Sequence, residues 1–468
     1  MIQRTSIENE VLQRIRPSTI ECDEIRTLCK KLIDTLSEIS DVPAMITGSI
    51  ARDTWIKGDK DIDLFMMYPP YFPIDKLKER GLSEAYVLVS KLGGISEEKY
   101  AEHPYLNAVI DGYNVDIVPC YHISSTSEMK CAVDRTPFHT KYILKHIGSL
   151  RDDILLLKQF TKGGGVYGSD HITGGFSGYL CELLIIRYGS FTNLLQTVST
   201  SFKEGEVIDI EGYYQDQKDI RKKFSDDPLI FIDPTDKNRN VAAALTRTQF
   251  AEFVSLARNY VQNPNLKYFI PDKQTKITKS EFNEILSNRD TELLAIKFNT
   301  PKLVEDVIVP QLRKSMNSIR SILESLDFQI HRSDTYMGSE HSLILFEFTV
   351  SKLPQIMIHY GPTIWNYENS DKFIDKHINP ENKHLSGPWI DNGRYYTEIP
   401  RKYTTAKSVL LDKNKILSGS IGKHVRITLE TTGYEVLSGS EIWSDEFSLF
   451  ISSYFNYSSQ SIRKLRSI

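Results

Sequence analysis

Residues 48–63 read Gly-Ser-Ile-Ala-Arg-Asp-Thr-Trp-Ile-Lys-Gly-Asp-Lys-Asp-Ile-Asp and combine a glycine-serine turn with two aspartates one residue apart. A short apolar run at 44–46 precedes the turn, and a second apolar run follows the aspartates. Successive side chains of a strand point to opposite faces, so Asp61 and Asp63 share one face and their apolar neighbours share the other. Two adjacent carboxylates repel each other, and a divalent metal ion would relieve that repulsion. By itself, however, an Asp-x-Asp pair is more often a solvated loop feature.

A third carboxylate, Asp116, strengthens the metal-site hypothesis. Residues 106–110 and 113–118 are apolar runs separated by Asp-Gly, which readily adopts the positive φ angles of a tight turn, so they predict a hairpin. Asp116 lies on the face of the second strand opposite its apolar neighbours. A lone aspartate in such a strand is commonly an exposed edge residue. A sheet could equally place it beside Asp61 and Asp63.

The turn supplies groups that suit a polyphosphate. It offers backbone N–H groups, the Ser49 hydroxyl and the positive end of a following helix, and Arg52 lies one helical turn further on. Three carboxylates on neighbouring strands could hold two metal ions that activate a hydroxyl and stabilise a leaving oxygen. This combination predicts phosphoryl or nucleotidyl transfer.

Composition sets broad limits on the protein. A chain of 468 residues exceeds what one hydrophobic core usually organises, so three or four domains are expected. The net charge of −4 does not itself indicate a nucleic-acid partner, although a basic groove can coexist with acidic faces. Five cysteines without a C-x-x-C pair suggest reduced thiols rather than disulfides or a zinc site. No apolar signal core or membrane-spanning run occurs, which predicts a soluble cytoplasmic protein without a membrane partner.

Apolar periodicity and capping signals predict the remaining elements. In order, these are a helix from Ser18 to about 41, a strand at 61–68, helices at 74–92, from 149 to 163, 177–188 and 241–256, a polar linker from about 268, a strand at 294–298, a helix at 310–326, and strands at 341–350 and 355–359. The helix at 179–188 is apolar almost all round except for Glu182 and Arg187, so it should be buried in a second, helical domain.

Two later stretches interleave basic and aromatic residues, Arg394-Tyr395-Tyr396 and Arg401-Lys402-Tyr403. Such pairs can bind a phosphate backbone and stack on bases. An ordinary solvated strand with tyrosines explains them equally well.

Several long motifs resemble a known family. Gly48-Ser49 with Asp61-Ile62-Asp63 and a distant strand Asp116 resembles the nucleotidyltransferase superfamily of DNA polymerase β. The chain is similar over nearly its whole length to the archaeal, class I CCA-adding enzymes, in the motifs Gly-Ser-x-Ala-Arg-x-Thr-Trp, Ala101 to Tyr105, Val115 to Tyr121, Ala132 to His139, Phe176 to Glu182, Arg239 to Ala242, Asn392 to Arg394 and Arg401 to Thr405. Ile50 departs from the aromatic residue expected in the first motif.

The resemblance implies a tRNA nucleotidyltransferase that adds C, C and A to tRNA 3′ ends from CTP and ATP without a nucleic-acid template. Asp61, Asp63 and Asp116 would hold two Mg²⁺ ions. The residues implied to bind the triphosphate are Ser49, Arg52, Lys158 and Tyr167. Thr136 and His139 would line the sugar and phosphate pocket, and Arg239 would read the base edge. The residues implied to contact tRNA are Arg394, Arg401 and Lys402. Without the resemblance, Lys158 reads as a solvent-facing helix lysine and His139 as a structural histidine.

The resemblance also implies an α+β multidomain architecture. It comprises a polymerase-β-like nucleotidyltransferase head at 1–148, a helical neck at 149–257, a body at 258–310 with 390–468, and a tail at 311–389. The α+β body and tail would bind the acceptor and TΨC arm of tRNA, and the protein would be a homodimer. Two rival functions share features with this interpretation: a poly(A) polymerase or oligoadenylate synthetase relative, and a catalytically silent RNA-binding protein.

Overall fold

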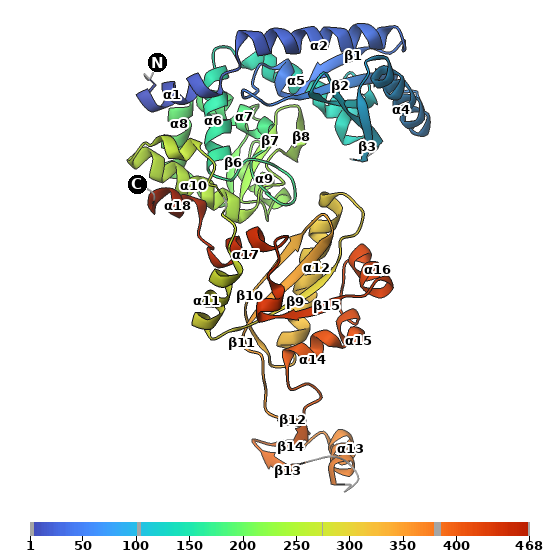
Figure 1. The fold of residues 1–468 in the computed structure, drawn as a ribbon, viewed down its shortest axis with the longest axis vertical. Coiled ribbons are helices and arrows are strands. Elements are labelled where there is room, and N and C mark those ends of the chain that lie inside the picture. The colour runs from blue at the N-terminus through green and yellow to red at the C-terminus, as the bar shows by residue number, and fades with distance from the viewer. Residues whose placement is uncertain (1–3, 101–103, 274, 379–384, 467–468) are drawn as a thin grey trace. The chain divides into compact units, whose positions relative to one another are not determined.

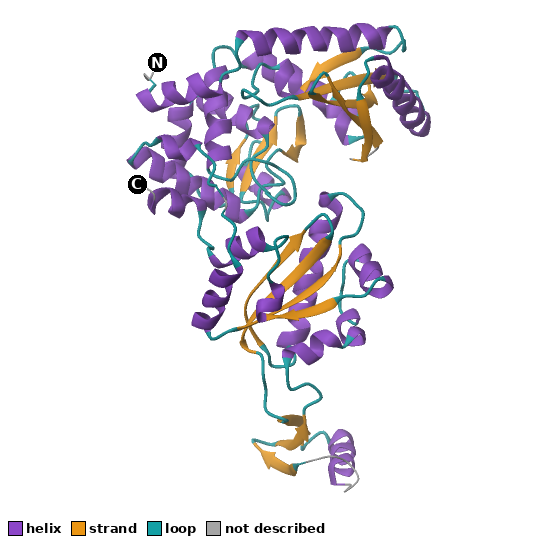
Figure 2. Ribbon diagram, viewed as in Figure 1, coloured by secondary structure: helices purple, strands orange, loops and turns teal. Residues whose placement is uncertain are grey.

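The structure, a computed structural model, describes residues 4–100, 104–273, 275–378 and 385–466 (Figure 1, Figure 2). The chain forms two compact units, Met1–Asp272 with Ser458–Ile468, and Lys273–Tyr457. Both units contain helices and sheets, which confirms the predicted α+β multidomain class. In the part of the chain that is described, no helix has the length and apolar character needed to cross a membrane.

The first unit contains a five-stranded sheet in the order β1-β2-β5-β4-β3. Its strands are β1 (Ala44–Thr47), β2 (Asp61–Tyr68), β3 (Ile95–Tyr100), β4 (Pro104–Ile110) and β5 (Tyr113–Tyr121). β2 and β5 are parallel, whereas the other neighbours are antiparallel. The strand predicted at 61–68 and the hairpin around Asp111-Gly112 are confirmed.

One face of this sheet is apolar and packs with helices α2 (Thr19–Ser37) and α4 (Ile74–Lys91). Ile62 and Ile117 lie in this core, fully or almost fully buried. Because side chains alternate along a strand, the aspartates of β2 and β5 project from the opposite face.

At the start of α2, the Ser18 hydroxyl accepts a hydrogen bond from the Glu21 N–H, as the sequence predicts.

The second part of this unit is largely helical. Its main helices are α6 (Arg151–Gly163), α7 (Gly178–Tyr188), α8 (Phe191–Ser201) and α10 (Arg247–Gln262). They share one hydrophobic core, in which α7 is central, as its composition predicts. The predicted start of the helix at 241 is wrong: α10 begins at Arg247, where the Thr246 side chain caps it by accepting from the Gln249 N–H.

A small three-stranded sheet, which we did not predict, lies in this helical part. Its order is β6-β7-β8, with β6 (Glu206–Ile208), β7 (Leu229–Asp233) and β8 (Asp236–Asn240). β7 is fully buried. The shorter helices of the unit are α1 (Ser6–Ile15), α3 (Gly48–Ala51), α5 (Thr136–His146) and α9 (Gln217–Lys223), with 3-10 turns at Thr126–Glu128, Ala132–Arg135 and Leu266–Phe269.

The last helix, α18 (Gln460–Arg466), belongs to the first unit although nearly two hundred residues separate it from α10. The buried Lys464 ammonium donates to the Ile270 carbonyl, at 2.6 Å, and pairs with Asp272. The Asn259 side chain of α10 donates to the Ser461 carbonyl, at 3.2 Å. The second unit is therefore an insertion within the first along the chain.

The second unit is built on a four-stranded sheet in the order β10-β11-β9-β15. Its strands are β9 (Glu292–Asn299), β10 (Gln329–Met337), β11 (His341–Val350) and β15 (Glu435–Ser438). Two cores cover its two faces: one includes α12 (Glu305–Glu324), α14 (Ala406–Leu411), α15 (Lys413–Leu417) and α16 (Lys423–Thr431), and the other includes α11 (Lys279–Arg289), the 3-10 turn Gly439–Ile442 and α17 (Ser448–Phe455).

A separate three-stranded sheet in this unit has the order β12-β14-β13. It comprises β12 (Ile356–Thr363), β13 (Ser386–Asp391) and β14 (Arg394–Pro400), with α13 (Tyr367–Ile378) beside it. The range 311–389, which we expected to form the tail, contains β12 and part of β13 together with β10 and β11 of the four-stranded sheet and most of α12, which packs on that sheet. Within that sheet β11 pairs antiparallel with β9 from His341 to Phe348.

Candidate functional site

The three aspartates lie on one face of the first sheet. β2 and β5 run parallel with Asp63 directly opposite Asp116, and Asp61 precedes Asp63 by two residues on the same face. Asp61 is exposed, whereas Asp63 and Asp116 are partly buried. The parallel register thus brings together the three carboxylates that the sequence places on separate runs.

Two asparagines contact these carboxylates, and the sequence analysis missed both. The Asn107 amide on β4 donates to Asp116 Oδ1 at 2.6 Å, and the Asn114 amide on β5 donates to Asp61 Oδ1 at 3.0 Å. Burial, and then repulsion from Asp116, raise the pKa of Asp63 to about 6. Burial also raises the pKa of Asp116, which the Asn107 hydrogen bond counteracts. These shifts show that the charges are poorly compensated.

The donor chemistry of this face suits a hard divalent cation. Carboxylate oxygens are the preferred protein ligands of Mg²⁺, and a cation would relieve the repulsion that raises the pKa of Asp63. Among the described residues, no group of three or more His, Cys, Asp or Glu side chains is arranged so that it could hold a metal ion. The aspartates therefore have the right chemistry and a shared face, but their side chains do not converge as a ready ligand set.

The glycine-serine turn packs directly against this face. Thr47, the last residue of β1, pairs with Asp63, and Gly48 follows with a φ of 69°. A Cβ atom at Gly48 would lie 1.8 Å from Asp63 Oδ2. Only glycine fits here, both because φ is positive and because the carboxylate occupies the space. Ser49 stands in the first turn of α3, partly buried.

Arg52 and Lys158 meet at a buried carboxylate, Glu182, that the sequence analysis did not assign to the site. Arg52 Nε lies 3.0 Å from Glu182 Oε2, and Lys158 Nζ lies 3.0 Å from Glu182 Oε1. Lys158 is 2% exposed, so the alternative of a solvent-facing lysine is wrong. A Cβ atom on Gly178 would lie 3.1 Å from the Tyr167 hydroxyl and 3.6 Å from Lys158 Nζ, so these two polar ends share one neighbourhood.

A second buried carboxylate, Asp233, joins two other predicted residues. Its Oδ2 atom lies 2.8 Å from His139 Nε2 and 2.9 Å from Arg239 Nη1. The His139 ring stacks on Tyr179 at 3.9 Å between centroids. Burial lowers the pKa of His139, and the contact with Asp233 opposes this shift without reversing it. Thr136, at the start of α5, lies one helical turn before His139.

A cavity of about 500 Å³ opens beside Arg239. Arg135, Ser177, Asp236 and Asn240 also line it. This volume lies within the usual range for small-molecule sites. Polar side chains and the apolar residues Phe224, Val241, Ala243 and Ala244 both line the cavity.

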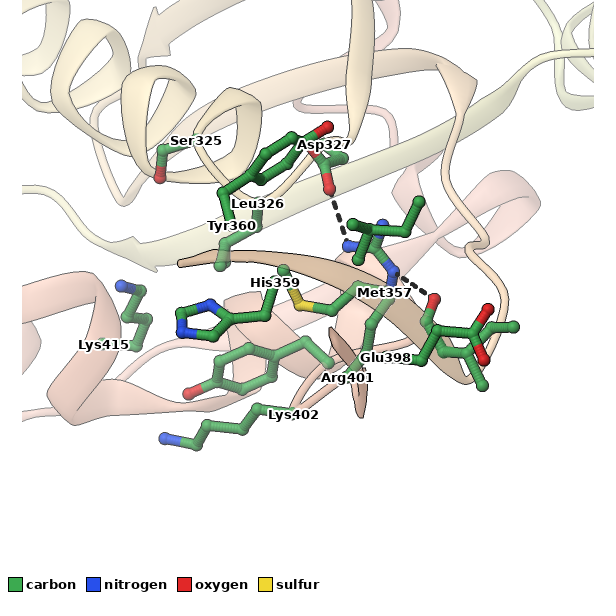
Figure 3. A pocket seen from close by; sticks show the side chains of 13 residues that line it. Ser325, Leu326, Asp327, Met357, His359, Tyr360, Glu398, Arg401, Lys402 and Lys415 are labelled. Atoms are coloured by element: carbon green, nitrogen blue, oxygen red, sulfur yellow. Dashed lines mark hydrogen bonds and ion pairs between the residues drawn. The ribbon is translucent and has the colours of Figure 1, made fainter. Parts of the chain in front are cut away.

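The second unit contains a larger cleft, of about 860 Å³, between the end of α12 and the sheet of β12 and β14 (Figure 3). Arg401 and Lys402, two residues predicted to contact tRNA, both line it. Figure 3 shows Arg401 directed toward Asp327, with 2.7 Å between Nη1 and Oδ2, whereas Lys402 and Lys415 end away from that pair. Arg394, the third predicted residue, lies exposed at the start of β14 and does not line the cleft.

Other predicted positions can be placed more briefly. His103 and its neighbours 101 and 102 lie outside the described residues. Ile50, the departure from the family motif, is a buried core residue beneath the turn. The signal that could have identified Glu182 was present in the sequence, because it is an acid within an otherwise apolar helix. Asp233 stands at the end of a short apolar run and gives no comparable signal.

Comparison with known proteins gives matches along most of the chain. Residues 29–146 match the nucleotidyltransferase domain, residues 152–270 the second domain of tRNA nucleotidyltransferase, and residues 289–439 the C-terminal domain of the CCA-adding enzyme. The CCA-adding enzyme of Methanoregula boonei is 42% identical over 466 residues, which cover 99% of this chain and 98% of that protein.

Other relatives have the same description. The CCA-adding enzyme of Methanosarcina mazei is 40% identical, with 92% of this chain and 93% of that protein covered. The CCA-adding enzyme of Archaeoglobus fulgidus is 33% identical, with 94% of this chain and 96% of that protein covered. Among solved structures, a cytoplasmic RNA terminal U-transferase aligns with a TM-score of 0.45 and 14% identity, over 57% of this chain and 97% of that one.

Proposed function

Because this chain belongs to the family of CCA-adding enzymes, we propose that it adds C, C and A to the 3′ end of tRNA from CTP and ATP, without a nucleic-acid template. The observation that carries this proposal is the pairing of Asp63 with Asp116 beside the Gly48-Ser49 turn. In each addition the terminal 3′ oxygen of tRNA bonds to the α-phosphorus. The bond from that phosphorus to pyrophosphate breaks, and the hydroxyl proton is released.

Asp61, Asp63 and Asp116 are proposed to hold two Mg²⁺ ions at this face. Bound there, the ions would lower the pKa of the attacking hydroxyl and stabilise the leaving oxygen. The raised pKa values of Asp63 and Asp116 support the proposal, since a cation would favour both ionised forms. Chelation with EDTA should abolish nucleotide addition, and added Mg²⁺ should restore it.

The nucleotide is proposed to lie between the turn and the Arg239 cavity. Ser49 and Arg52 would bind the triphosphate, with Lys158 and Tyr167 behind them. Thr136 and His139 would line the sugar and phosphate pocket, and Arg239 would read the base edge. The two buried carboxylates support this assignment, because each one fixes two of these side chains in place.

The second unit is proposed to bind the acceptor and TΨC arm of tRNA. Lys402 is the strongest of the three predicted contacts, since its side chain is 76% exposed at the cleft. Arg401 is 15% exposed and already paired with Asp327, so its contribution would be mainly to shape the cleft. Arg394 is exposed at the far end of β14 and would contact a different part of the RNA backbone.

The proposed domain roles follow the expected order, with a catalytic head at 1–148, a neck at 149–257, and a body and tail beyond. The tail that the strand pairing supports is the sheet of β12–β14 with α13.

We also propose a cytoplasmic homodimer. The exposed edge strand β13, with Ile390 56% exposed, is a candidate contact. Light scattering should give twice the monomer mass, and Ile390→Lys should reduce it.

The decisive assay uses tRNA that lacks its 3′ end, with CTP and ATP supplied separately and together. CTP alone should add two residues, and both together should add three. Long homopolymeric A tails would instead indicate the poly(A) polymerase alternative, and no addition under any condition would indicate a silent RNA-binding protein.

Asp116→Ala should abolish nucleotide addition and leave tRNA binding largely unchanged, because it removes a proposed metal ligand far in sequence from the tRNA-binding unit. Filter binding with truncated tRNA measures the second quantity. Retained activity in this variant would contradict the two-metal assignment.

A further inference from the structure

Glu182 is a carboxylate inside an apolar helix. Its side chain is 0% exposed, and its neighbours in α7, Cys181 and Leu183, are also fully buried. An isolated buried carboxylate is costly, so its retention requires compensating partners. Those partners come from two other segments of the chain, residues 52–54 and α6.

Lys158 of α6 and Thr54 of the head surround the first oxygen of Glu182. Lys158 Nζ lies 2.8 Å from the Thr54 carbonyl, 3.1 Å from the Thr54 hydroxyl and 3.0 Å from Glu182 Oε1. The Thr54 hydroxyl in turn donates to Glu182 Oε1 at 2.5 Å. An ammonium group has three N–H donors, so all the donors of Lys158 are used within this cluster.

Arg52 contacts the second oxygen of Glu182. Its Nε atom lies 3.0 Å from Glu182 Oε2, and its Nη1 atom donates to the Thr140 hydroxyl at 3.2 Å. Arg52 is 6% exposed, and its positive charge is close enough to Asp63 to lower the pKa of that group in part. The Arg52 charge thus acts both on Glu182 and on the carboxylate of Asp63.

The cluster is a buried three-residue charge network rather than a simple ion pair. Two cations share one anion, and burial, which disfavours ionisation of Glu182, is outweighed by Lys158 and Arg52, so the pKa of Glu182 is lowered. Arg52 and Thr54 come from the segment that follows the Gly48-Ser49 turn, while Glu182 and Lys158 come from the neck. The contacts to Glu182 thus fix the position of that segment on the neck.

We propose that Glu182 is a positioning residue for nucleotide addition, which holds Arg52 and the 52–54 segment in the place where the triphosphate binds. This inference rests on the proposed function. Lys158 acts in it chiefly as the second cation that keeps Glu182 ionised and oriented.

Glu182→Gln tests the charge with little change in shape. The two buried cations would then lack their shared anion, and hydrogen bonds to charged groups are strong enough that the loss should raise the KM for CTP and ATP about tenfold, by a similar factor for each. The kcat and the Kd for tRNA should change little. The matched control is Glu84→Gln, since Glu84 is also a buried glutamate but pairs with Arg80 and Tyr68 away from the turn.

Thr54→Val offers a milder change, because valine has nearly the shape of threonine and removes only the hydroxyl of the cluster. The KM for both nucleotides should rise about threefold, consistent with one hydrogen bond. Thr161→Val is its control, because Thr161 is equally buried on α6 and its hydroxyl bonds to the Leu157 and Lys158 carbonyls rather than to the Glu182 carboxylate.

Each outcome of these measurements decides the proposal. A raised nucleotide KM at an unchanged active fraction, measured by titration with truncated tRNA, supports positioning. An unchanged KM with a reduced active fraction would show a purely structural role, and a lowered KM would show that Glu182 competes with the triphosphate; either result overturns the proposal. If the wild-type protein adds no nucleotide at all, the proposed function itself fails.

Discussion

Asp63 is the residue at which the requirements of folding and chemistry conflict most directly. It is enclosed by the Gly48 turn and faces Asp116, and its pKa is raised to about 6. The ordinary pKa of an aspartate in an unfolded chain is about 3.9, so between these values the folded protein binds a proton that the unfolded chain does not. Without metal, the protonated Asp63 therefore makes its full contribution to the free energy of unfolding below about pH 4. This contribution is lost as the pH rises through about 6.

Asp63→Asn should consequently stabilise the metal-free protein while abolishing nucleotide addition. In EDTA at pH 8 we expect a gain of about 3 kcal/mol in the free energy of unfolding of the first unit, because this is the free energy that corresponds to raising the pKa of Asp63 from its ordinary value to about 6. The gain should shrink as the pH falls through 6. Calorimetry across this pH range measures it, with the exposed Asp34→Asn as control. A pH-independent difference would contradict the assignment.

Asp233 is expected to control base selection through Arg239. Asp233→Asn keeps the shape but weakens the contacts to His139 and Arg239, so the guanidinium would no longer be held in one orientation. The ratio of kcat/KM for CTP over UTP should fall at least tenfold, in line with the loss of a charge-assisted contact. Competition assays measure it, with the exposed helix cap Asp216→Asn as control. An unchanged ratio with lower overall activity would indicate a structural role only.

At the scale of elements, the turn between β1 and α3 is the most constrained segment of the head. Gly48 and Gly93 have the same φ of 69°, but only Gly48 has Asp63 in the space that a Cβ atom would fill. Gly93→Ala should cost about 1 kcal/mol from backbone strain alone. Gly48→Ala should cost more and also displace the Asp63 carboxylate, reducing kcat by at least a hundredfold. Equal effects of the two variants on activity would contradict the steric explanation.

The elements that the sequence predicts well are those specified by local signals. β2, the Asp111-Gly112 hairpin and the Ser18 and Ser177 caps depend on alternation, turn residues and capping groups within a few positions. The start of α10 was predicted six residues too early, because the apolar residues Val241 and Ala242 join the core from a turn. The sheet of β6–β8 was missed because its strands are only three to five residues long and β6 lies twenty residues before β7.

In the candidate site, too, the features set by local sequence could be predicted, and those set by distant contacts could not. The positions of Asp61, Asp63 and Asp116 on one face could be expected from strand alternation, whereas their register depends on which strands pair. The role of Glu182 depends on partners 24 to 130 residues away in the chain, and that of Asp233 depends on His139 of α5. Periodicity contains no information about such contacts, so they emerge only from the folded structure.

For the whole molecule, the return of α18 to the first unit is the main organisational feature. Lys464 is 2% exposed and contacts Ile270 and Asp272, close to where the chain enters the second unit. Deletion of 458–468 should lower the unfolding temperature of the first unit by several degrees, since it removes the buried Lys464 and its contacts with the Ile270 carbonyl and Asp272. Calorimetry should show the second unit unaffected. Equal destabilisation of both units would contradict the assignment of α18 to the first.

This return also affects how the protein is made. A ribosome releases the chain from its N-terminus, so every residue proposed for catalysis, from Ser49 to Arg239, is synthesised before the second unit begins. Helix α18, which belongs to the first unit, is synthesised after the second unit. A chain cut before residue 458 would therefore contain the full set of proposed catalytic residues on a first unit that lacks this helix. Docking of α18 thus completes the first unit only after the whole second unit has been synthesised.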